Sequence, residues 1–240
     1  MKNAIVTGGT KGIGLQIVKD LLAREYFVFL NYANDDQTAY LIEQELNKIS
    51  SNFKIVKANQ ANMEEFDSFI TLIKKKVTAV DCIVCNAGET LRKSAMSITN
   101  DEWERVMQVI VNSHFYLIRE LFELISSNSR IIFIGSMMGI YPHSVSLPYG
   151  VAKAAIHALA QNLVKVFQGT GTTINTIAPG FVDTEWQKSK AKDLKDRICQ
   201  KTALKRFATV EEVASACMFC LENDFVNGSV LEVNGGYCFE

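Results

Sequence analysis

The sequence predicts an α/β fold, a single doubly wound parallel sheet with helices on both faces. Two observations lead to this prediction. Short runs rich in β-branched and aromatic residues alternate with longer amphipathic stretches along all 240 residues, and a glycine-rich turn follows the first such run. Strands that alternate with helices of this length are joined by right-handed crossovers, which make the sheet parallel and cover both of its faces.

Composition indicates one domain spanning residues 1–240. Hydrophobic residues make up 48% of the chain, enough for a large core, and three prolines with no Gly/Ser tract leave no candidate linker. A net charge of −1 argues against nucleic acid or an anionic membrane as the main partner. No apolar run reaches transmembrane length, and the N-terminus enters a strand rather than a signal peptide, so we expect a cytoplasmic protein.

Two CxxC pairs raise the question of a metal site. Cys82 and Cys85 lie in a predicted strand, where positions three apart point to opposite faces. Cys217 and Cys220 share a helix face but have no evident second pair of ligands. We therefore expect reduced, mostly buried thiols and no metal.

The first half of the chain alternates regularly between the two patterns. Strands are expected where short apolar or β-branched runs occur, at Asn3–Val6, Tyr26–Leu30, Phe53–Lys57 and Asp81–Cys85. Helices are expected where apolar residues recur every three or four positions, at Gly12–Arg24, Gln37–Ile49 and Met63–Lys76.

The second half continues the alternation with longer helices. Apolar runs predict strands at Arg130–Ile134, Thr173–Ile177 and Ser229–Val233. Helical periodicity predicts a long helix from about Asn100 to Ile125, further helices at Tyr149–Phe167 and Val210–Leu221, and a charged helical segment at Trp186–Lys201.

The glycine-rich turn reads Thr7-Gly8-Gly9-Thr10-Lys11-Gly12-Ile13-Gly14. Glycines let a backbone turn tightly and approach a pyrophosphate, and the free N–H groups that open the next helix favour the same anion. The spacing differs from the common G-x-G-x-x-G fingerprint and from a P-loop. At the first β-to-α turn of a repeating βα pattern, it predicts a dinucleotide site.

A tyrosine and a lysine stand four residues apart in the predicted helix that begins at residue 149. At this spacing, Tyr149 and Lys153 project side by side. A free tyrosine has a pKa near ~10, and a nearby cation lowers it, which would make Tyr149 an acid or base near neutral pH. Ser136 follows a predicted buried strand, where parallel sheets place their ligands, and its hydroxyl can hold a carbonyl oxygen. An ordinary amphipathic helix can carry the same pair, so the remaining motifs decide.

With these motifs together, the chain resembles the short-chain dehydrogenase/reductase family over nearly its whole length. The motifs that carry the resemblance are TGGTKGIG at residues 7–14, Cys85-Asn86-Ala87-Gly88, Asn112, Ser136, YGVAK at 149–153, Pro179-Gly180, Val182-Asp183-Thr184 and Val233-Asn234-Gly235-Gly236. Their order and spacing match the family pattern, which implies a Rossmann-type oxidoreductase that acts on CH–OH and C=O groups.

The resemblance also implies residue roles. Asn112, Ser136, Tyr149 and Lys153 would form the catalytic tetrad, in which Lys153 lowers the tyrosine pKa and Asn112 orders a proton-relaying water. The dinucleotide would contact Gly8, Thr10, Lys11, Gly12, Ile13, Gly14, Asn31, Asn59, Asn86, Ala87, Gly88, Tyr149, Lys153, Pro179, Gly180, Val182 and Thr184.

Two positions depart from the family pattern, and a third region bears on the cofactor. Cys85 replaces an asparagine, and Asn59 stands where an aspartate near the adenine is common. The second strand ends without the carboxylate that binds the ribose 2′-OH of NAD, and Lys11 can reach a 2′-phosphate. Asp35 and Asp36 argue the other way, although capping of the next helix explains them as well. We expect NADPH rather than NADH.

Loops after the strand ends should line the substrate pocket. Met137, Met138, Ile140, Tyr141, Phe181 and Trp186 would make it largely apolar, with Glu89, Arg92 and His143 as polar candidates. Residues of about 184–206 form a predicted mobile lid, by resemblance and because the segment is mostly polar.

Within the family, the chain is most similar to 3-oxoacyl-carrier-protein reductases. An acidic carrier protein needs a basic docking surface, yet Ser126–Ser129 and Gln168–Thr172 contain no lysine or arginine. A general carbonyl reductase is therefore expected, with 3-oxoacyl thioesters as one substrate class. The alternatives are an NAD-dependent alcohol or sugar dehydrogenase and a non-catalytic dinucleotide sensor or scaffold. The helices at Asn100–Ile125 and Tyr149–Phe167 are apolar on more than one face, which predicts a homodimer or homotetramer.

Overall fold

The computed structural model describes residues 1–142, 146–188 and 190–237. They form a seven-stranded sheet in the order β3-β2-β1-β4-β5-β6-β7, with every neighbouring pair parallel. The strands are β1 (Asn3–Val6), β2 (Phe27–Tyr32), β3 (Phe53–Lys57), β4 (Val80–Cys85), β5 (Ile125–Ile134), β6 (Thr173–Pro179) and β7 (Val230–Val233). The strand order reverses between β1 and β4, where open α/β sheets bind ligands. The predicted doubly wound fold is confirmed.

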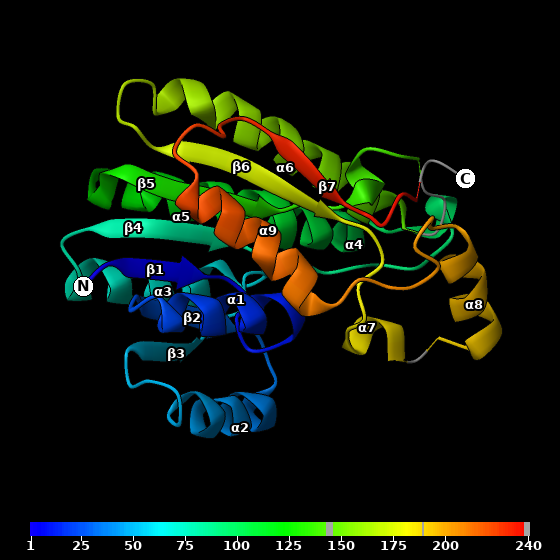
Figure 1. The fold of residues 1–240 in the computed structure, drawn as a ribbon, viewed down its shortest axis with the longest axis horizontal. Helices are drawn as coiled ribbons and strands as arrows, with labels where there is room; N and C mark the ends of the chain where they lie inside the picture. The colour runs from blue at the N-terminus through cyan, green and yellow to red at the C-terminus, as the bar shows by residue number, and fades with distance from the viewer. Residues whose placement is uncertain (143–145, 189, 238–240) are drawn as a thin grey trace.

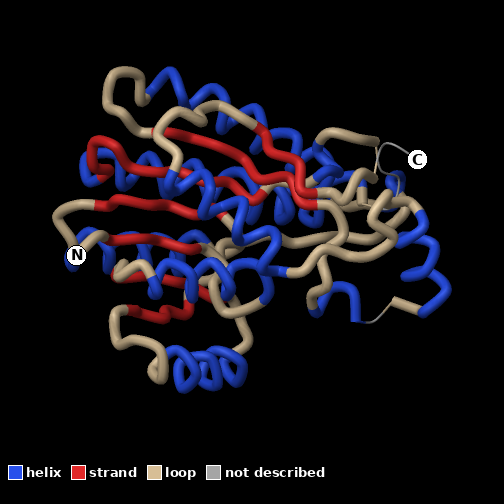
Figure 2. The backbone as a smooth tube through the Cα atoms, in the orientation of Figure 1, coloured by secondary structure: helices blue, strands red, loops and turns tan. Residues whose placement is uncertain are grey.

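Helices cover both faces of the sheet, as Figures 1 and 2 show. One layer packs its apolar residues against one side of the sheet and consists of α1 (Gly12–Ala23), α2 (Asp36–Leu46) and α9 (Val210–Glu222). The opposite layer consists of α3 (Met63–Lys76), α4 (Asn100–Met107), α5 (Ser113–Leu121) and α6 (Leu147–Val166).

Alternation along the strands divides the core between the two layers. In β1, Ala4 and Val6 pack in one cluster and Ile5 in the other. The same alternation places Cys82 and Cys85 on opposite sides of the sheet, as expected from their spacing. All three β1 side chains are fully buried, because a parallel sheet is covered on both faces.

The long helix predicted near Asn100–Ile125 is interrupted. A π-helix at Gln108–Asn112 joins α4 to α5, and a 3₁₀ turn at Phe122–Leu124 leads directly into β5. Two side chains bond to backbone carbonyls in the interrupted region. Ser113 Oγ donates to the Val109 carbonyl over 2.9 Å, and His114 Nδ1 lies 2.8 Å from the Ile110 carbonyl oxygen. Such bonds compete with the regular helical ladder, which gives the interruption a physical cause.

The carboxyl ends of the strands carry the irregular segments. Short 3₁₀ turns occur at η1 (Ala95–Ser97) and η4 (Met137–Gly139). The charged segment predicted as one helix forms two, α7 (Glu185–Lys188) and α8 (Lys192–Gln200), which lie beyond the ends of the strands (Figure 1). A parallel bridge between Val182 and Ala208 brings the two ends of this segment together.

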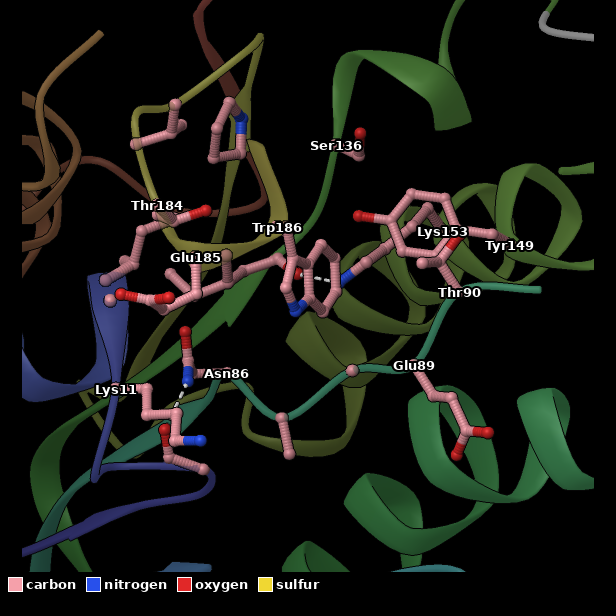
Figure 3. Close-up of a pocket in the computed structure, with 18 of the residues that line it drawn as sticks. Lys11, Asn86, Glu89, Thr90, Ser136, Tyr149, Lys153, Thr184, Glu185 and Trp186 are labelled. Atoms are coloured by element: carbon pink, nitrogen blue, oxygen red, sulfur yellow. Dashed lines mark hydrogen bonds between the residues drawn. The ribbon is translucent and has the colours of Figure 1, made fainter. Parts of the chain in front are cut away.

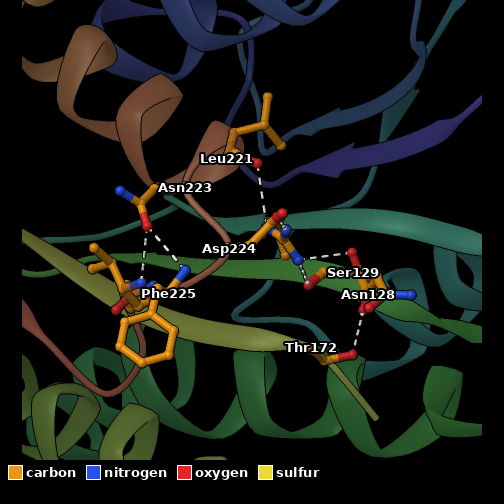
Figure 4. Close-up of polar contacts among 10 residues, drawn as sticks. Asn128, Ser129, Thr172, Leu221, Asn223, Asp224 and Phe225 are labelled. Carbon is orange, nitrogen blue, oxygen red and sulfur yellow. Dashed lines mark hydrogen bonds and ion pairs between the residues drawn. The ribbon is translucent and has the colours of Figure 1, made fainter.

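The opposite edge of the sheet is held by Arg130 (Figure 4). This side chain, 7% exposed, donates to the carbonyls of Leu221, Asn128 and Ser129 and pairs with Asp224. Figure 4 places Asn128, Ser129 and Thr172 close together, so the two uncharged segments noted in the sequence meet at this edge. They lie away from the strand ends that carry the predicted site.

Candidate active site

One continuous cavity of about 890 Å³ opens at the carboxyl ends of the strands. Sixteen of the seventeen residues predicted to contact the dinucleotide line it, the exception being Gly14. Three of the four predicted tetrad members, Ser136, Tyr149 and Lys153, also line it, whereas Asn112 does not. The fold therefore brings together the glycine turn and the tyrosine helix, which are more than a hundred residues apart in sequence.

Asn86 explains the requirement for glycine at position 14. Its Nδ2 donates to the carbonyl of Thr7 over 2.9 Å and to that of Gly8 over 3.1 Å, so it ties the loop after β4 to the turn after β1. A Cβ on Gly14 would lie 2.4 Å from Asn86 Nδ2 and 2.4 Å from the Gly8 carbonyl oxygen. Gly14 therefore does not line the cavity, but its lack of a side chain leaves room for Asn86 to hold the glycine turn in place.

A buried chain of polar groups supports the same loop. Thr7 Oγ1 accepts hydrogen bonds from the backbone N–H groups of Asn86 and Ala87, at 2.9 and 3.0 Å, and lies 3.0 Å from His114 Nε2. Burial lowers the pKa of His114 to about 3, so the ring is neutral. With Nδ1 donating to Ile110, Nε2 can accept the Thr7 hydroxyl proton. The individual roles of Thr7 and His114 were not predicted from the sequence.

Asn31 and Asn59 line the cavity but also hold the backbone. Asn31 Oδ1 accepts from the N–H of Gly8 over 3.1 Å, and its Nδ2 donates to the carbonyl of Ala58 over 2.7 Å. Asn59 Oδ1 accepts from the N–H of Ala61 over 2.9 Å, which closes a turn after β3. Through these two hydrogen bonds Asn31, which is 2% exposed, joins the glycine turn to the end of β3.

Tyr149, Ser136 and Lys153 meet at the inner end of the cavity. Figure 3 shows the Tyr149 hydroxyl directed towards Ser136, with Lys153 beside the tyrosine ring. Lys153 Nζ lies 5.6 Å from the centroid of that ring and donates to the Ile134 carbonyl. Ser136 Oγ accepts from the N–H of Met138 over 3.1 Å, which fixes the hydroxyl oxygen.

Burial dominates the protonation of this cluster, and the expected effect of Lys153 on the tyrosine stays a prediction. Burial raises the pKa of Tyr149 to about 12, and the hydrogen bond with Ser136 acts in the lowering direction. Burial also lowers the pKa of Lys153 to about 7. An amine with this pKa is about half protonated at neutral pH. The neighbour whose hydrogen bond lowers the tyrosine pKa here is Ser136.

Asn112 lies at the end of the π-helix. Its Nδ2 donates to Gln108 Oε1 over 3.3 Å, and Gln108 in turn donates to the carbonyl of Gln60 over 3.4 Å. The side chain is thus engaged with its own helix outside the cavity wall. Its predicted part in a proton relay stays a prediction.

His157 contacts the segment that carries Ser136. The backbone N–H of Ser136 donates to His157 Nε2 over 3.3 Å, and the ring is 7% exposed. A Cβ on Gly135 would lie 2.3 Å from Nε2, and one on Gly139 would lie 2.9 Å from Cε1, so the ring fills the space that these two glycines leave. The sequence signal was present, because His157 stands four residues after Lys153 on the same helix face.

Both carboxylates after β2 are engaged. Asp35 caps α2 by accepting from the Thr38 N–H over 3.0 Å, and its carboxylate also pairs with Lys11. The Lys11 ammonium holds the pKa of Asp35 well below its usual range. Asp36 pairs with Lys57 over 2.7 Å. The capping that the sequence suggested is confirmed for Asp35, and the lysine of the glycine turn reaches this corner of the cavity.

The remaining wall of the cavity is mixed in character. Of the apolar residues predicted there, Met138, Phe181 and Trp186 line it, whereas Met137, Ile140 and Tyr141 do not. Trp186 packs edge-on against Tyr149, with ring centroids 6.4 Å apart. Glu89 and Arg92 also line the cavity, and His143 lies outside the described residues.

Residues 1–142, 146–188 and 190–237 contain neither a metal-binding cluster nor a membrane-spanning helix. No three His, Cys, Asp or Glu side chains in these ranges gather to hold a metal ion. None of the helices in the same ranges is both long and apolar enough to cross a lipid bilayer.

Comparisons with known proteins agree with this geometry. A family model described as short chain dehydrogenase matches residues 2–195. The 3-oxoacyl-[acyl-carrier-protein] reductase FabG of Staphylococcus epidermidis is 28% identical over 239 residues, which cover 98% of each chain. A short-chain dehydrogenase/reductase structure from Serratia marcescens has a TM-score of 0.92 at 26% identity and covers 98% of this chain and 97% of that one. A blue fluorescent protein from a metagenomic library, solved with NADPH, also has a TM-score of 0.92 at 26% identity, with 99% and 98% covered.

Proposed function

This chain belongs to the short-chain dehydrogenase family, and from that premise we propose that it reduces a carbonyl group to an alcohol with NADPH. The observation that carries the proposal is the single cavity in which the glycine turn and the cluster of Ser136, Tyr149 and Lys153 share one wall. A dinucleotide site that opens directly onto a tyrosine and a serine hydroxyl is suited to hydride and proton transfer at one carbon–oxygen bond.

The glycine turn has the features that a dinucleotide pyrophosphate requires. Helix α1 begins at Gly12 with no side-chain cap from Lys11 and no acidic residue in its first turn, so its first N–H groups face the turn without a competing carboxylate. Gly8 has a φ of 62°, which is unfavourable for other residues and lets the backbone curve around an anion. When bound, NADPH supplies the hydride for the reduction.

The protonation state of Tyr149 suits the reductive direction. With a pKa raised to about 12 by burial, the phenol keeps its proton at neutral pH and can donate it to a developing alkoxide. The hydrogen-bonding partner Ser136 stands where it can hold the same oxygen. Lys153, held by the Ile134 carbonyl, would bind the nicotinamide ribose.

Choice between the two nicotinamide cofactors would depend on Lys11 and Asp35. We propose that Lys11 turns from Asp35 towards a 2′-phosphate, since the two residues form an ion pair in the cavity wall beside the glycine turn. Lys11→Gln should lower the ratio of NADPH to NADH affinity about tenfold or more, and Asp35→Asn should raise it, because the competing charge is lost while the cap on α2 can remain. Lys57→Gln is the matched control, since Lys57 pairs with Asp36 outside the cavity. An unchanged ratio in Lys11→Gln would refute this assignment.

A 3-oxoacyl thioester is the substrate class that the relatives suggest, since several of them are named 3-oxoacyl-[acyl-carrier-protein] reductases. The test follows absorbance at 340 nm with NADPH and S-acetoacetyl-N-acetylcysteamine. Thioester-dependent loss of absorbance supports the reductase. Tight NADPH binding with no oxidation against thioesters or simple ketones would reject it.

The second candidate function is an NAD-dependent alcohol or sugar dehydrogenase that runs in the oxidative direction. The carboxylate of Asp35 in the cavity wall is the observation that favours it, because a carboxylate there can accept from a ribose 2′-OH. Tighter binding of NADH than of NADPH, together with alcohol-dependent NADH formation, would select this alternative.

We also propose that the chain forms a homo-oligomer through α5 and α6. Phe115, Phe122, Val151 and Val166 on or beside these helices are exposed apolar side chains. Light scattering on the purified protein tests this directly, and a strictly monomeric mass at assay concentration would contradict it.

A further inference from the structure

Two segments that carry cations line the cavity. One is the loop after β4, and it is anchored to the start of α6: Ser146 Oγ donates to the Leu91 carbonyl over 2.6 Å and accepts from Thr90 Oγ1 over 3.2 Å. Arg92 is the next residue in this loop and lines the cavity. The anchor therefore fixes Arg92 close to the turn of α6 that carries Tyr149.

The second segment belongs to residues 184–206, the stretch predicted from the sequence to be a lid. Lys190 lies between α7 and α8, lines the cavity and is partly buried. Its Nζ donates to Gln187 Oε1 and lies 5.8 Å from the centroid of the Phe181 ring. Burial, then the charges of Arg92 and Lys195, lower the pKa of Lys190, so these cations lie near enough to repel one another.

The charges of the cavity wall do not balance. Three carboxylates line the cavity in the described part of the chain, and none of them is free. Asp35 pairs with Lys11, and Glu89 pairs with Arg105 over 2.7 Å. Glu185 also has an interaction partner. Within the described part of the chain, four of the lining cations have no carboxylate partner, namely Arg92, Lys153, Lys190 and Lys201. A cleft lined by unpaired charge of one sign concentrates anions.

We propose that the substrate carries an anionic group, a phosphate or a carboxylate, at a distance from its carbonyl, and that Arg92 and Lys190 bind this group. The inference rests on the proposed reductase function and adds the substrate class to it. Lysines at a protein surface are usually only solvated, but Lys190 is partly buried beside other cations, an arrangement that an incoming anion would relieve. An arginine and a lysine that line one cavity close to each other can both donate charge-assisted hydrogen bonds to one phosphate or carboxylate.

The kinetic test uses one reacting group on three carriers. Acetoacetyl thioesters of N-acetylcysteamine (neutral), glutathione (carboxylates) and coenzyme A (phosphates) are compared by kcat/KM for the wild type, Arg92→Gln, Lys190→Gln and Lys192→Gln. Lys192 is the matched control, because it is a lid lysine that does not line the cavity. We expect one anionic thioester to be preferred over the neutral one, and each cavity variant to lower that preference about tenfold or more. The control should retain it.

A binding measurement separates this inference from the proposed reaction. Coenzyme A itself has no reducible carbonyl, and its affinity for the NADP⁺-loaded protein is measured by calorimetry in the same four proteins, alongside glutathione. If no thioester is reduced but coenzyme A or glutathione binding depends on Arg92 and Lys190, the reaction is wrong and the anion subsite stands. Equal kcat/KM for neutral and anionic thioesters, or losses no greater than those of Lys192→Gln, would overturn the subsite.

Discussion

Replacement of His157 by leucine tests how much the hydrogen bond between the Ser136 N–H and the His157 ring contributes to stability and activity. The Ser136 N–H donates to His157 Nε2 over 3.3 Å, and the two residues are 6% and 7% exposed. Burial, with the charge of Lys153, lowers the pKa of His157 to about 4, so at pH 7 the ring is neutral and Nε2 is free to accept. His157→Leu keeps a similar volume against Gly135 and Gly139 but removes the acceptor.

The cost of this substitution follows from the amide left without a partner. A buried donor deprived of its acceptor costs about 1–3 kcal/mol, and the free energy of unfolding should fall by that amount. If the segment relaxes by moving Ser136, the displaced hydroxyl stabilises the transition state less well and kcat falls. Each loss of about 1.4 kcal/mol in that stabilisation lowers kcat tenfold.

Urea unfolding and steady-state reduction of a carbonyl substrate test the two effects. His157→Gln is the matched control, because its amide oxygen can accept the same N–H, and it should recover much of the stability and of kcat. A leucine variant with the wild-type unfolding midpoint and an unchanged kcat would show that His157 does not support Ser136.

Three further predictions address the glycine turn, the buried histidine of α5 and the far edge of the sheet. Gly14→Ala should weaken NADPH binding about tenfold or more in a fluorescence titration, because the new Cβ would displace Asn86, 2.4 Å away; an unchanged Kd would contradict this. His114 has a pKa of about 3 when folded and ~6.5 when unfolded, so the unfolded chain binds the extra proton and stability should fall as pH drops below 6.5, by about 1.4 kcal/mol per pH unit. Urea unfolding of His114→Gln at pH 7.5, 6 and 5 should show a shallower fall than the wild type, and equal slopes would refute the assignment. Arg130→Met should lower the free energy of unfolding by about 2 kcal/mol or more and leave the Kd for NADPH unchanged, because Arg130 holds the opposite edge of the sheet; a weakened Kd would contradict that separation.

Local sequence patterns predicted the bounds of those helices and strands whose position depends only on their own apolar periodicity. The strands Asn3–Val6 and Phe53–Lys57 and the helix Met63–Lys76 have the predicted bounds, because apolar periodicity alone places them. The interruption near Gln108–Asn112 was not predicted. It involves Ser113, which also accepts a 2.6 Å hydrogen bond from Gln60, fifty-three residues away, and such a contact cannot be read from a local pattern.

The candidate site shows the same division. Motif spacing predicted the lining of the cavity by the glycine turn, Tyr149 and Lys153. The roles of Asn31 and His114 depend on which backbone groups the folded chain leaves beside them, and so required the register of β2 with β3 and the packing of α5. The raised pKa of Tyr149 could not be anticipated either, because burial outweighs the hydrogen bond with Ser136 only once the pocket is formed.

The measurement that tests the central claim most directly is the activity of Tyr149→Phe. The change removes one hydroxyl and keeps the ring that packs against Trp186. We predict that kcat for carbonyl reduction falls by about 10²–10⁴, the usual contribution of a general acid, while the Kd for NADPH stays within about twofold. A variant that binds NADPH normally and keeps most of its reductase activity would show that the proton comes from another group.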